Sequence, residues 1–131
     1  MSSQKDPTAV AVARAHVEAW GSHDYDSARA SLAPDVHVAV TSVDPEAPSV
    51  DTTGIEEYMQ GLVQFGQAVL PGTSSVNSAV GDHSRALLRV TSRVKFGPDA
   101  PEMTVHGARL YRLDENRKIV DEQVIFFLTP Q

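Results

Sequence analysis

The sequence predicts an α+β fold in which a sheet wraps over helices. Three segments with the apolar spacing of helices come first and end before Pro71 and Gly72. Segments in which apolar and polar residues alternate, as in strands, fill most of the rest. No internal repeat, low-complexity tract or linker divides the 131 residues. We therefore expect a flexible tail over residues 1–6 and a single domain over residues 7–131.

The first helix is expected over residues 7–20. Its apolar positions recur at steps of three or four residues: Val10, Ala13, Val17 and Trp20. Pro7 fits the first helical turn, where its missing N–H is harmless, and Asp6 can cap that turn. His16 lies beside the apolar stripe. It either completes the core or serves a site, where it can donate a hydrogen bond or relay a proton near neutral pH.

Two shorter elements follow Gly21, which ends the first helix. Asp24 can cap a second helix over residues 25–32, which Pro34 terminates. Valines alternate with smaller or polar residues over 36–40, and this pattern predicts a half-buried strand.

The segment 42–52 contains Pro45 and Pro48, so we expect an irregular loop there. Thr53 and Glu56 have the spacing of a capping box, which predicts the start of a third helix. The apolar residues of this helix again follow helical spacing: Ile55, Tyr58, Met59, Leu62 and Phe65.

The C-terminal half of the chain has the pattern of strands. Residues 73–80 are a weak candidate because they are rich in serine. Residues 85–96 show the clearest alternation, with charged residues on one face and an apolar set on the other: Ala86, Leu88, Val90, Val94 and Phe96. Strands over 104–113 and 118–128 are joined by the short polar segment 114–117 and should pair as a hairpin.

Two charged residues interrupt the apolar faces of that hairpin. Arg109 shares its parity with Val105 and Tyr111 on the first strand. Glu122 shares its parity with the apolar set of the second strand: Val120, Val124, Phe126 and Leu128. Because an unpaired charge in an apolar layer is costly, we expect the guanidinium and the carboxylate to form a polar spot inside a cavity. They are either a structural ion pair or a site where Glu122 acts as a general acid or base.

Composition narrows the choice of partners and cofactors. Hydrophobic residues make up 41% of the chain, which predicts a folded protein. The 17 acidic and 11 basic residues give a net charge of −6 without a basic cluster, so neither nucleic acid nor an anionic membrane is an expected partner. No apolar run predicts a membrane span or a secretory signal. The lack of cysteine fits a cytoplasmic location, and because the histidines lack metal-ligand spacing we expect no metal site.

The outer face of the final hairpin predicts a homodimer. Ile119, Ile125 and Phe127 have the opposite parity from the pocket set. Three large apolar side chains on an outer sheet face exceed what a solvated monomer needs. We therefore expect a second copy of the chain to cover them.

Four stretches of the chain resemble the nuclear transport factor 2-like superfamily, specifically its SnoaL-like branch. They are Ala13–Trp20, Ser22–Tyr25, Gly54–Ile55 and Arg117–Glu122, and the resemblance extends from residue 8 to residue 127. It implies a conical α+β barrel in which three N-terminal helices pack into a strongly bent, mostly antiparallel sheet that encloses a hydrophobic pocket. Members of the family include ketosteroid isomerases, polyketide cyclases, epoxide hydrolases, dehydratases and non-catalytic binding proteins, and many are homodimers.

The resemblance to the isomerases implies several site residues by position. Their oxyanion-hole tyrosine falls at His16. Their general-base aspartate falls at Asp44 if a short gap is allowed and at Val40 without one. Their second, protonated aspartate falls at Arg109, which argues against steroid isomerisation because a guanidinium stays charged.

The other enzyme branches imply an overlapping set. The acid/base aspartate on the last strand of the polyketide cyclases falls near Glu122 or Val124. The epoxide hydrolases use an arginine between two carboxylates to orient water, and Arg109 with Glu122 and Asp44 is similar to that set in composition.

Two functions stay open. The first is a cofactor-independent isomerase, cyclase or hydrolase that acts on an apolar, carbonyl- or epoxide-bearing metabolite by proton transfer. In it, Glu122 or Asp44 is the base, Arg109 orients that carboxylate or stabilises negative charge, and His16 or Tyr111 is the donor. The alternative is a non-catalytic binding or accessory protein for a hydrophobic ligand. The expected substrate-binding wall comprises Trp20, Val40, Tyr58, Met59, Leu62, Leu88, Val90, Val124 and Phe126.

Overall fold

Three helices and six strands make up the part of the chain that the structure, a computed structural model, describes: residues 6–46 and 49–130. In chain order they are α1 (Thr8–Gly21), α2 (Tyr25–Ala30), β1 (Leu32–Ser42), β2 (Val50–Thr53), α3 (Ile55–Gly66), β3 (Ser75–Gly81), β4 (Arg85–Lys95), β5 (Glu102–Leu113) and β6 (Ile119–Pro130). The tail predicted over 1–6 lies outside the described residues, except for Asp6.

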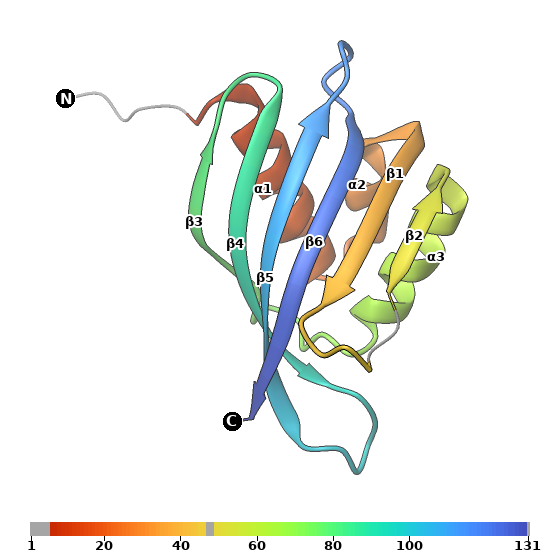
Figure 1. Ribbon diagram of the computed structural model, residues 1–131, viewed down its shortest axis with the longest axis vertical. Coiled ribbons are helices and arrows are strands. Elements are labelled where there is room, and N and C mark those ends of the chain that lie inside the picture. The colour runs from red at the N-terminus through yellow and green to blue at the C-terminus, as the bar shows by residue number, and fades with distance from the viewer. Residues whose placement is uncertain (1–5, 47–48, 131) are drawn as a thin grey trace, which may run out of the picture.

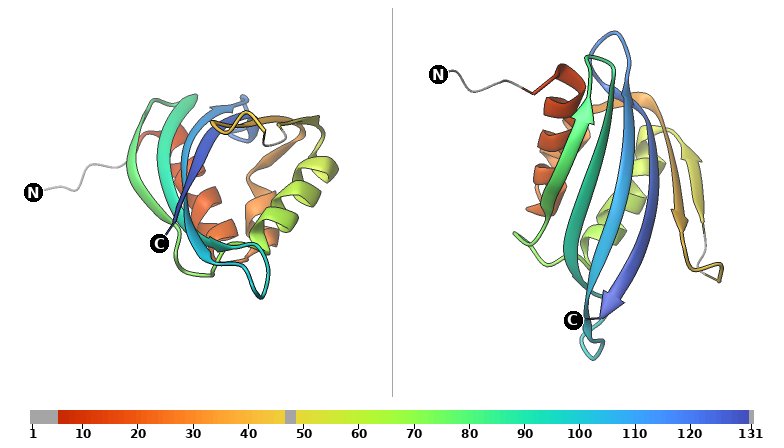
Figure 2. Two further views of the ribbon diagram at one scale, coloured as in Figure 1. Left: turned by 60° about the horizontal axis from the view of Figure 1, so that its bottom comes forward. Right: turned by 60° about the vertical axis from the view of Figure 1, so that its left-hand side comes forward.

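All six strands belong to one sheet, in the order β2-β1-β6-β5-β4-β3. Neighbouring strands are antiparallel except β1 and β6, which are parallel. The sheet is strongly curved but does not close into a barrel, and the helices lie on its concave side (Figure 1 and Figure 2). The predicted α+β fold, with helices held inside a bent and mostly antiparallel sheet, is confirmed.

The two longer helices cover different halves of the sheet. α1 packs on β3, β4 and β5, whereas α3 packs on β1 and β2. The predicted apolar stripe of α1 faces the sheet, and its four members are at most 2% exposed: Val10, Ala13, Val17 and Trp20. Burying such side chains supplies most of the stability that holds the helices in place. Because α1 covers β3, β4 and β5, the concave face of β1 and β2 is covered by α3 instead.

Two of the three predicted helix caps are wrong. Asp6 does not cap α1, whose N-terminus has no side-chain cap. The capping box predicted from Thr53 and Glu56 does not form. Gly54 occupies the N-cap position of α3 with a φ of 111°, and Glu56 forms an ion pair with Arg29 of α2. The third prediction is confirmed, because Asp24 accepts a hydrogen bond from the backbone N–H of Ser27 at 3.2 Å.

The segment 42–52, predicted to be an irregular loop, contains most of the edge strand β2. This strand pairs antiparallel with β1, so that Val50 lies opposite Val40. Its four residues show no apolar alternation that would reveal a strand. Its pairing with β1 supplies the hydrogen bonds that local sequence does not predict. β1 begins at Leu32, where the second helix was expected to end.

A β-bulge at the start of β6 overturns one prediction for the outer face. The pairing of β5 with β6 shifts there and leaves Val120 as an extra residue on β6. The extra residue reverses the parity before it, so Ile119 is fully buried and does not belong to the outer face. Ile125 and Phe127 lie beyond the bulge and are exposed, as predicted.

Two apolar residues predicted for the core are exposed instead. Phe96 lies just past the end of β4 and is 56% exposed, and Leu128, near the end of β6, is 37% exposed. The ends of these strands project beyond the helices, so no helix covers them (Figure 1). Strand alternation predicts which face a residue takes but not how far the helices reach along the sheet.

Candidate functional site

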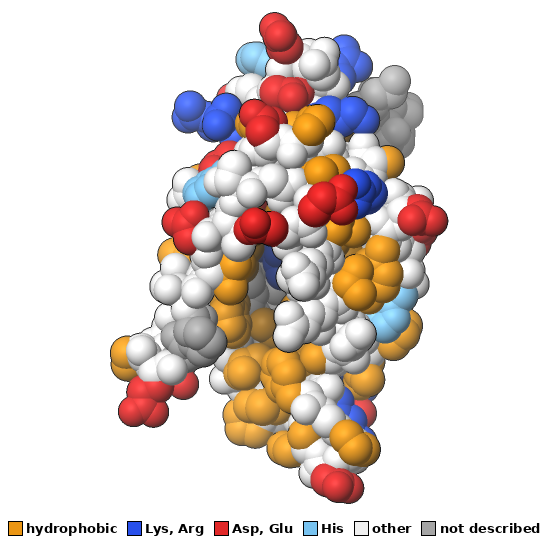
Figure 3. All heavy atoms as spheres, turned by 90° about the vertical axis from the view of Figure 1, so that its right-hand side faces the viewer, with side chains coloured by type: hydrophobic (Ala, Val, Ile, Leu, Met, Phe, Trp, Pro, Cys, Tyr) orange, Lys and Arg blue, Asp and Glu red, His pale blue; other side chains and the backbone are white. Residues whose placement is uncertain are grey.

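A cavity of about 260 Å³ lies between α3 and the concave faces of β1, β2, β5 and β6. The side of the molecule that carries β2 and α3 is hollowed, and hydrophobic side chains gather around the hollow (Figure 3). Five of the predicted wall residues line the cavity: Val40, Tyr58, Leu62, Val124 and Phe126. Four others are buried elsewhere in the core and do not line it: Trp20, Met59, Leu88 and Val90.

Arg109 of β5 and Glu122 of β6 both line this cavity. The guanidinium donates a hydrogen bond to Oε2 of Glu122 at 3.1 Å, and the two side chains are 12% and 2% exposed. Strand register explains their meeting, because Tyr111 lies opposite Glu122 and Arg109 is two residues from Tyr111 on the same face. The guanidinium also lies over the ring of Trp20, 4.8 Å from the ring centre. Both charged groups therefore project toward the concave interior.

A chain of hydrogen bonds continues from Glu122 into the core. The hydroxyl of Tyr58 donates to Oε1 of Glu122. The same hydroxyl lies 2.9 Å from Nε2 of His16, and Nδ1 of His16 donates to the carbonyl oxygen of Ala28 at 3.0 Å. These contacts connect all three helices to β6, and they end at the cavity.

Burial controls the protonation of this chain. Burial lowers the pKa of His16, and the negative charge of Glu122 partly offsets that effect. Burial also raises the pKa values of Tyr58 and Tyr111 well above the ordinary value for tyrosine, and the charge of Glu122 raises both further. Both tyrosines therefore keep their hydroxyl hydrogen at neutral pH.

The remaining catalytic candidates have different surroundings. Tyr111 is fully buried beside Glu122, and its ring meets the ring of His16 edge-on at 6.1 Å, but it does not line the cavity. Asp44 lies exposed in the connection from β1 to β2, where Oδ1 accepts a hydrogen bond from the backbone N–H of Glu46 at 3.0 Å. It does not line the cavity either. The structure thus brings Arg109 and Glu122 together and leaves Asp44 apart from them.

Sequence reasoning missed the central position of Tyr58 and the contribution of β2. Tyr58 was predicted to line the cavity with a hydroxyl that can orient a ligand, without a link to His16 or Glu122, yet its hydroxyl joins those two residues. A signal for this role was present, because a tyrosine on the apolar face of a helix needs a partner for its hydroxyl. Thr52 of β2 also lines the cavity, and nothing in the local sequence indicated it.

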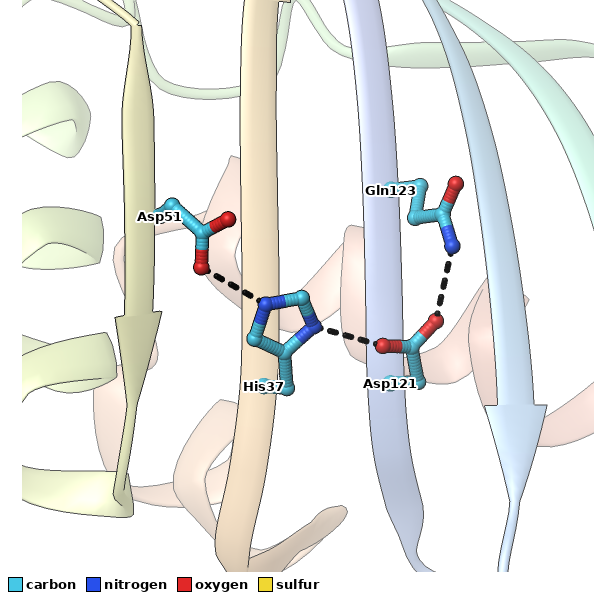
Figure 4. Close-up of polar contacts among 4 residues, drawn as sticks. All are labelled: His37, Asp51, Asp121 and Gln123. Carbon is cyan, nitrogen blue, oxygen red and sulfur yellow. Dashed lines mark hydrogen bonds and ion pairs between the residues drawn. The ribbon is translucent and has the colours of Figure 1, made fainter.

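A second polar cluster lies on the convex face of the sheet, across β2, β1 and β6 (Figure 4). Nδ1 of His37 lies 2.7 Å from Oδ1 of Asp121, and Nε2 lies 2.7 Å from Oδ1 of Asp51. Gln123 donates a hydrogen bond to the other oxygen of Asp121 at 3.3 Å. The hydrogen bonds to Asp121 and Asp51 raise the pKa of His37. The imidazolium form of His37 can therefore donate to both carboxylates.

Neither cluster is arranged as a metal centre. Within residues 6–46 and 49–130, no group of three His, Cys, Asp or Glu side chains is arranged to hold a metal ion. In the same part of the chain, no helix combines the length and the apolar character needed to span a bilayer.

A sequence match over most of the chain shows which family it belongs to. The SnoaL-like domain family matches residues 13–122 of this chain. The chain belongs to the SnoaL-like domain family. No curated protein matches the chain.

Solved structures share the fold of this SnoaL-like domain at low sequence identity. RV0760c from Mycobacterium tuberculosis has a TM-score of 0.76 at 15% identity, over 93% of this chain and 92% of that one. RV0760c is also known in complex with estradiol-17β-hemisuccinate. An LEH-like epoxide hydrolase of M. tuberculosis has a TM-score of 0.68 at 18% identity, over 91% and 82% of the two chains. A Silicibacter pomeroyi DSS-3 protein with a cystatin-like fold has a TM-score of 0.68 at 20% identity, over 89% and 74%.

Proposed function

We propose that this SnoaL-like domain binds a small apolar metabolite with a carbonyl or epoxide oxygen and transfers a proton on it without a cofactor. The observation that carries the proposal is the position of Glu122, whose side chain is 2% exposed yet lines a mostly apolar cavity. A carboxylate in such a place is costly without strong partners. Tyr58 and Arg109 each donate a hydrogen bond to it, which supports a charged group where a ligand would bind.

The cavity supports a ligand that is small and mostly apolar. Its volume of about 260 Å³ is below the ~300–1,000 Å³ typical of pockets for drug-sized ligands. At the ~30 Å³ that one water occupies in the liquid, it accommodates roughly nine non-hydrogen atoms. Leu62, Val124 and Phe126 supply apolar surface, while Arg109 and Glu122 supply a polar end. On this fold, the estradiol-17β-hemisuccinate complex of RV0760c supports a mostly apolar ligand, and the LEH-like epoxide hydrolase supports an epoxide.

Glu122 is the group that takes up and returns the proton. Each oxygen of a carboxylate has two lone pairs, so the hydrogen bonds from Tyr58 and Arg109 leave capacity for another hydrogen. With a ketone, Glu122 removes a proton from the carbon next to the carbonyl and returns it at a second carbon. With an epoxide, it takes a proton from the water whose oxygen forms a bond to one ring carbon. The bond between that carbon and the ring oxygen breaks, and Glu122 then gives the proton to the released oxygen. In both cases the charge of Arg109 lies near the negative charge that develops on the ligand oxygen.

The variant Glu122→Gln tests this function with a panel of small substrates, for instance 3-cyclohexenone, cyclohexene oxide and styrene oxide. We expect the wild-type protein to convert at least one of them and Glu122→Gln to reduce turnover by about 10²–10⁴-fold, the range for general acid–base catalysis. Asp121→Asn is the matched control because it makes the same chemical change one residue away, on the opposite face of β6. Retained turnover by a correctly folded Glu122→Gln protein would remove Glu122 from the mechanism.

One observation favours a second function, which is ligand binding without catalysis. Both oxygens of Glu122 already accept a hydrogen bond, from Tyr58 and from Arg109. In a carrier or accessory protein these contacts would only hold the polar end of the cavity in place. This function gains support if 2-naphthol binds to the wild-type protein, if Leu62→Trp abolishes that binding, and if no member of the panel is converted.

We also propose that this SnoaL-like domain is a homodimer through the convex face of its sheet. Leu87, Leu110, Ile125 and Phe127 lie on the adjacent strands β4, β5 and β6 and are between 40% and 58% exposed. A contiguous apolar patch of this kind is unusual on a monomer. Ile125→Lys should shift the elution volume in size-exclusion chromatography from dimer to monomer at micromolar concentration. A wild-type protein that elutes as a monomer under the same conditions would contradict the proposal.

A further inference from the structure

The hydroxyl of Tyr58 faces two groups that both accept hydrogen bonds in their ordinary forms. One is Nε2 of His16, 2.9 Å away, and the other is Oε1 of Glu122. A tyrosine hydroxyl has one hydrogen and can donate it to only one of them. If Tyr58 donates to Glu122, then His16 must donate to Tyr58.

Ala28 fixes which nitrogen of His16 carries hydrogen. A carbonyl oxygen only accepts hydrogen bonds, so Nδ1, which lies 3.0 Å from the Ala28 oxygen, is protonated. In a neutral imidazole the other nitrogen, Nε2, then has no hydrogen. A neutral His16 and an ionised Glu122 would therefore both require the single hydrogen of Tyr58. One of the two contacts would bring acceptor against acceptor.

We propose that His16, Tyr58 and Glu122 together hold one proton more than a neutral histidine, a tyrosine and a carboxylate, and that this proton moves between His16 and Glu122 through the hydroxyl of Tyr58. In one arrangement His16 is an imidazolium that donates to Tyr58, and Tyr58 donates to Glu122. In the other, Glu122 is a carboxylic acid that donates to Tyr58, and Tyr58 donates to His16. Both arrangements satisfy every contact.

The transfer between the two arrangements is balanced. The Nε2–H bond of His16 and the original O–H bond of Tyr58 break. A new O–H bond forms on Tyr58, and another forms on Oε1 of Glu122. The cluster gains and loses no hydrogen and no charge, so the proton crosses the core without a net movement of any side chain.

The charged and titratable groups around the chain act in opposite directions. Arg109, 3.1 Å from Oε2, favours the carboxylate and therefore the arrangement with the proton on His16. Burial lowers the pKa of His16 and favours the arrangement with the proton on Glu122. Tyr111, which packs edge-on against His16 from β5, keeps its own hydrogen because burial raises its pKa. Opposed influences of this kind are the condition under which two groups share a proton.

The catalytic consequence rests on the proposed function. The shared proton would allow Glu122 to meet a ligand as a base or as an acid, while Arg109 stays on Oε2 in both arrangements. His16 is fully buried and does not line the cavity, so it acts only through Tyr58. His16 is therefore a positioning residue that stores a proton, and Glu122 is the group that touches the ligand.

Solution NMR of the free protein tests the proton count without a substrate. With ¹⁵N in the histidine rings and ¹³C in the glutamate carboxyl groups, we expect Nε2 of His16 and Cδ of Glu122 to titrate together with one shared midpoint. A neutral His16 beside an ionised Glu122 at every pH where the protein is folded would overturn the proposal. Because no ligand is present, this outcome is independent of whether the substrate panel is converted.

Two variants test whether His16 takes up the shared proton through Tyr58 or only packs in the core. His16→Gln keeps an N–H that can donate to Tyr58 but cannot take up a proton, so the Cδ signal of Glu122 should stay at the carboxylate position across the folded pH range. His23→Gln is the matched control, since His23 contacts a backbone carbonyl at 2.9 Å elsewhere, and it should leave the Glu122 titration unchanged. Tyr58→Phe should give His16 and Glu122 separate midpoints. A Glu122 titration that is the same in wild type and in His16→Gln, or a common midpoint that survives in Tyr58→Phe, would overturn the proposal.

Discussion

Asp121 and Glu122 are consecutive residues of β6, yet they belong to clusters on opposite faces of the sheet. Glu122 points into the concave side, where it meets Tyr58 and Arg109 and is 2% exposed. Asp121 points to the convex side, where it meets His37, whose side chain is 35% exposed. Each cluster contains a histidine, but the concave cluster is buried and has one carboxylate, whereas the convex cluster is more exposed and has two.

That difference reverses the behaviour of the two histidines. Burial lowers the pKa of His16, whereas hydrogen bonds to two carboxylates raise the pKa of His37. On the convex face water can replace any partner that is removed. On the concave face, where Glu122 is 2% exposed and His16 is fully buried, water has little access, so each group there depends on the others. Removing one member should therefore cost far more on the concave side than on the convex side.

The largest expected effect is the loss of Arg109. Arg109→Met leaves the buried carboxylate of Glu122 without its ion-pair partner, which should reduce the free energy of unfolding by about 3–5 kcal/mol at pH 8. Asp51→Asn removes one partner of the exposed cluster and should cost less than about 1 kcal/mol. Urea denaturation of both variants and the wild type measures the two values.

A double variant identifies the cause of that loss. Arg109→Met combined with Glu122→Gln removes both charges and should recover part of the stability that Arg109→Met loses. Equal losses for Arg109→Met and Asp51→Asn, or a double variant that is less stable than Arg109→Met, would contradict the contrast between the two faces.

A smaller effect is expected at Tyr58. Tyr58→Phe keeps the ring but removes the hydroxyl that joins His16 and Glu122, so two buried polar groups lose a partner. The expected loss in the free energy of unfolding is about 1–3 kcal/mol. Tyr25→Phe makes the same change on α2 and serves as the control in the same denaturation series. If both substitutions reduce the free energy of unfolding by the same amount, the hydroxyl of Tyr58 does not stabilise the buried cluster.

The sequence predicted the parts of this arrangement that depend on local periodicity. The apolar stripe of α1 and the alternation of β4 gave the correct buried faces, and strand parity placed Arg109 and Glu122 on the concave side. The same parity was wrong at Ile119 because a single extra residue, Val120, reverses it at the bulge. Periodicity carries no information on where such a residue is inserted.

The contacts that define each cluster depend on how distant elements pack, which local patterns do not encode. His16 meets Tyr58 across 42 positions of sequence, and their contact requires α1 and α3 to dock side by side in the curved sheet. His37 meets Asp51 only because β2 forms, and it meets Asp121 only because β1 and β6 pair in parallel. The sequence predicted neither the pairing of β1 with β2 nor that of β1 with β6, so it could not predict the convex cluster.

The smallest expected effect is a pH dependence of the convex cluster. The folded-state pKa of His37 lies above its ordinary value of about 6.5, so its contribution to stability is fully present below that pH and is lost as the pH rises through the folded-state value. Because Asp51 is 75% exposed, the contribution should be only about 0.2–1 kcal/mol. His37→Gln should therefore reduce the free energy of unfolding at pH 6 and have less effect at pH 9, with His83→Gln in the β3–β4 turn as the control. A cost of His37→Gln that grows from pH 6 to pH 9 would show that the neutral form of His37 holds β2, β1 and β6 together.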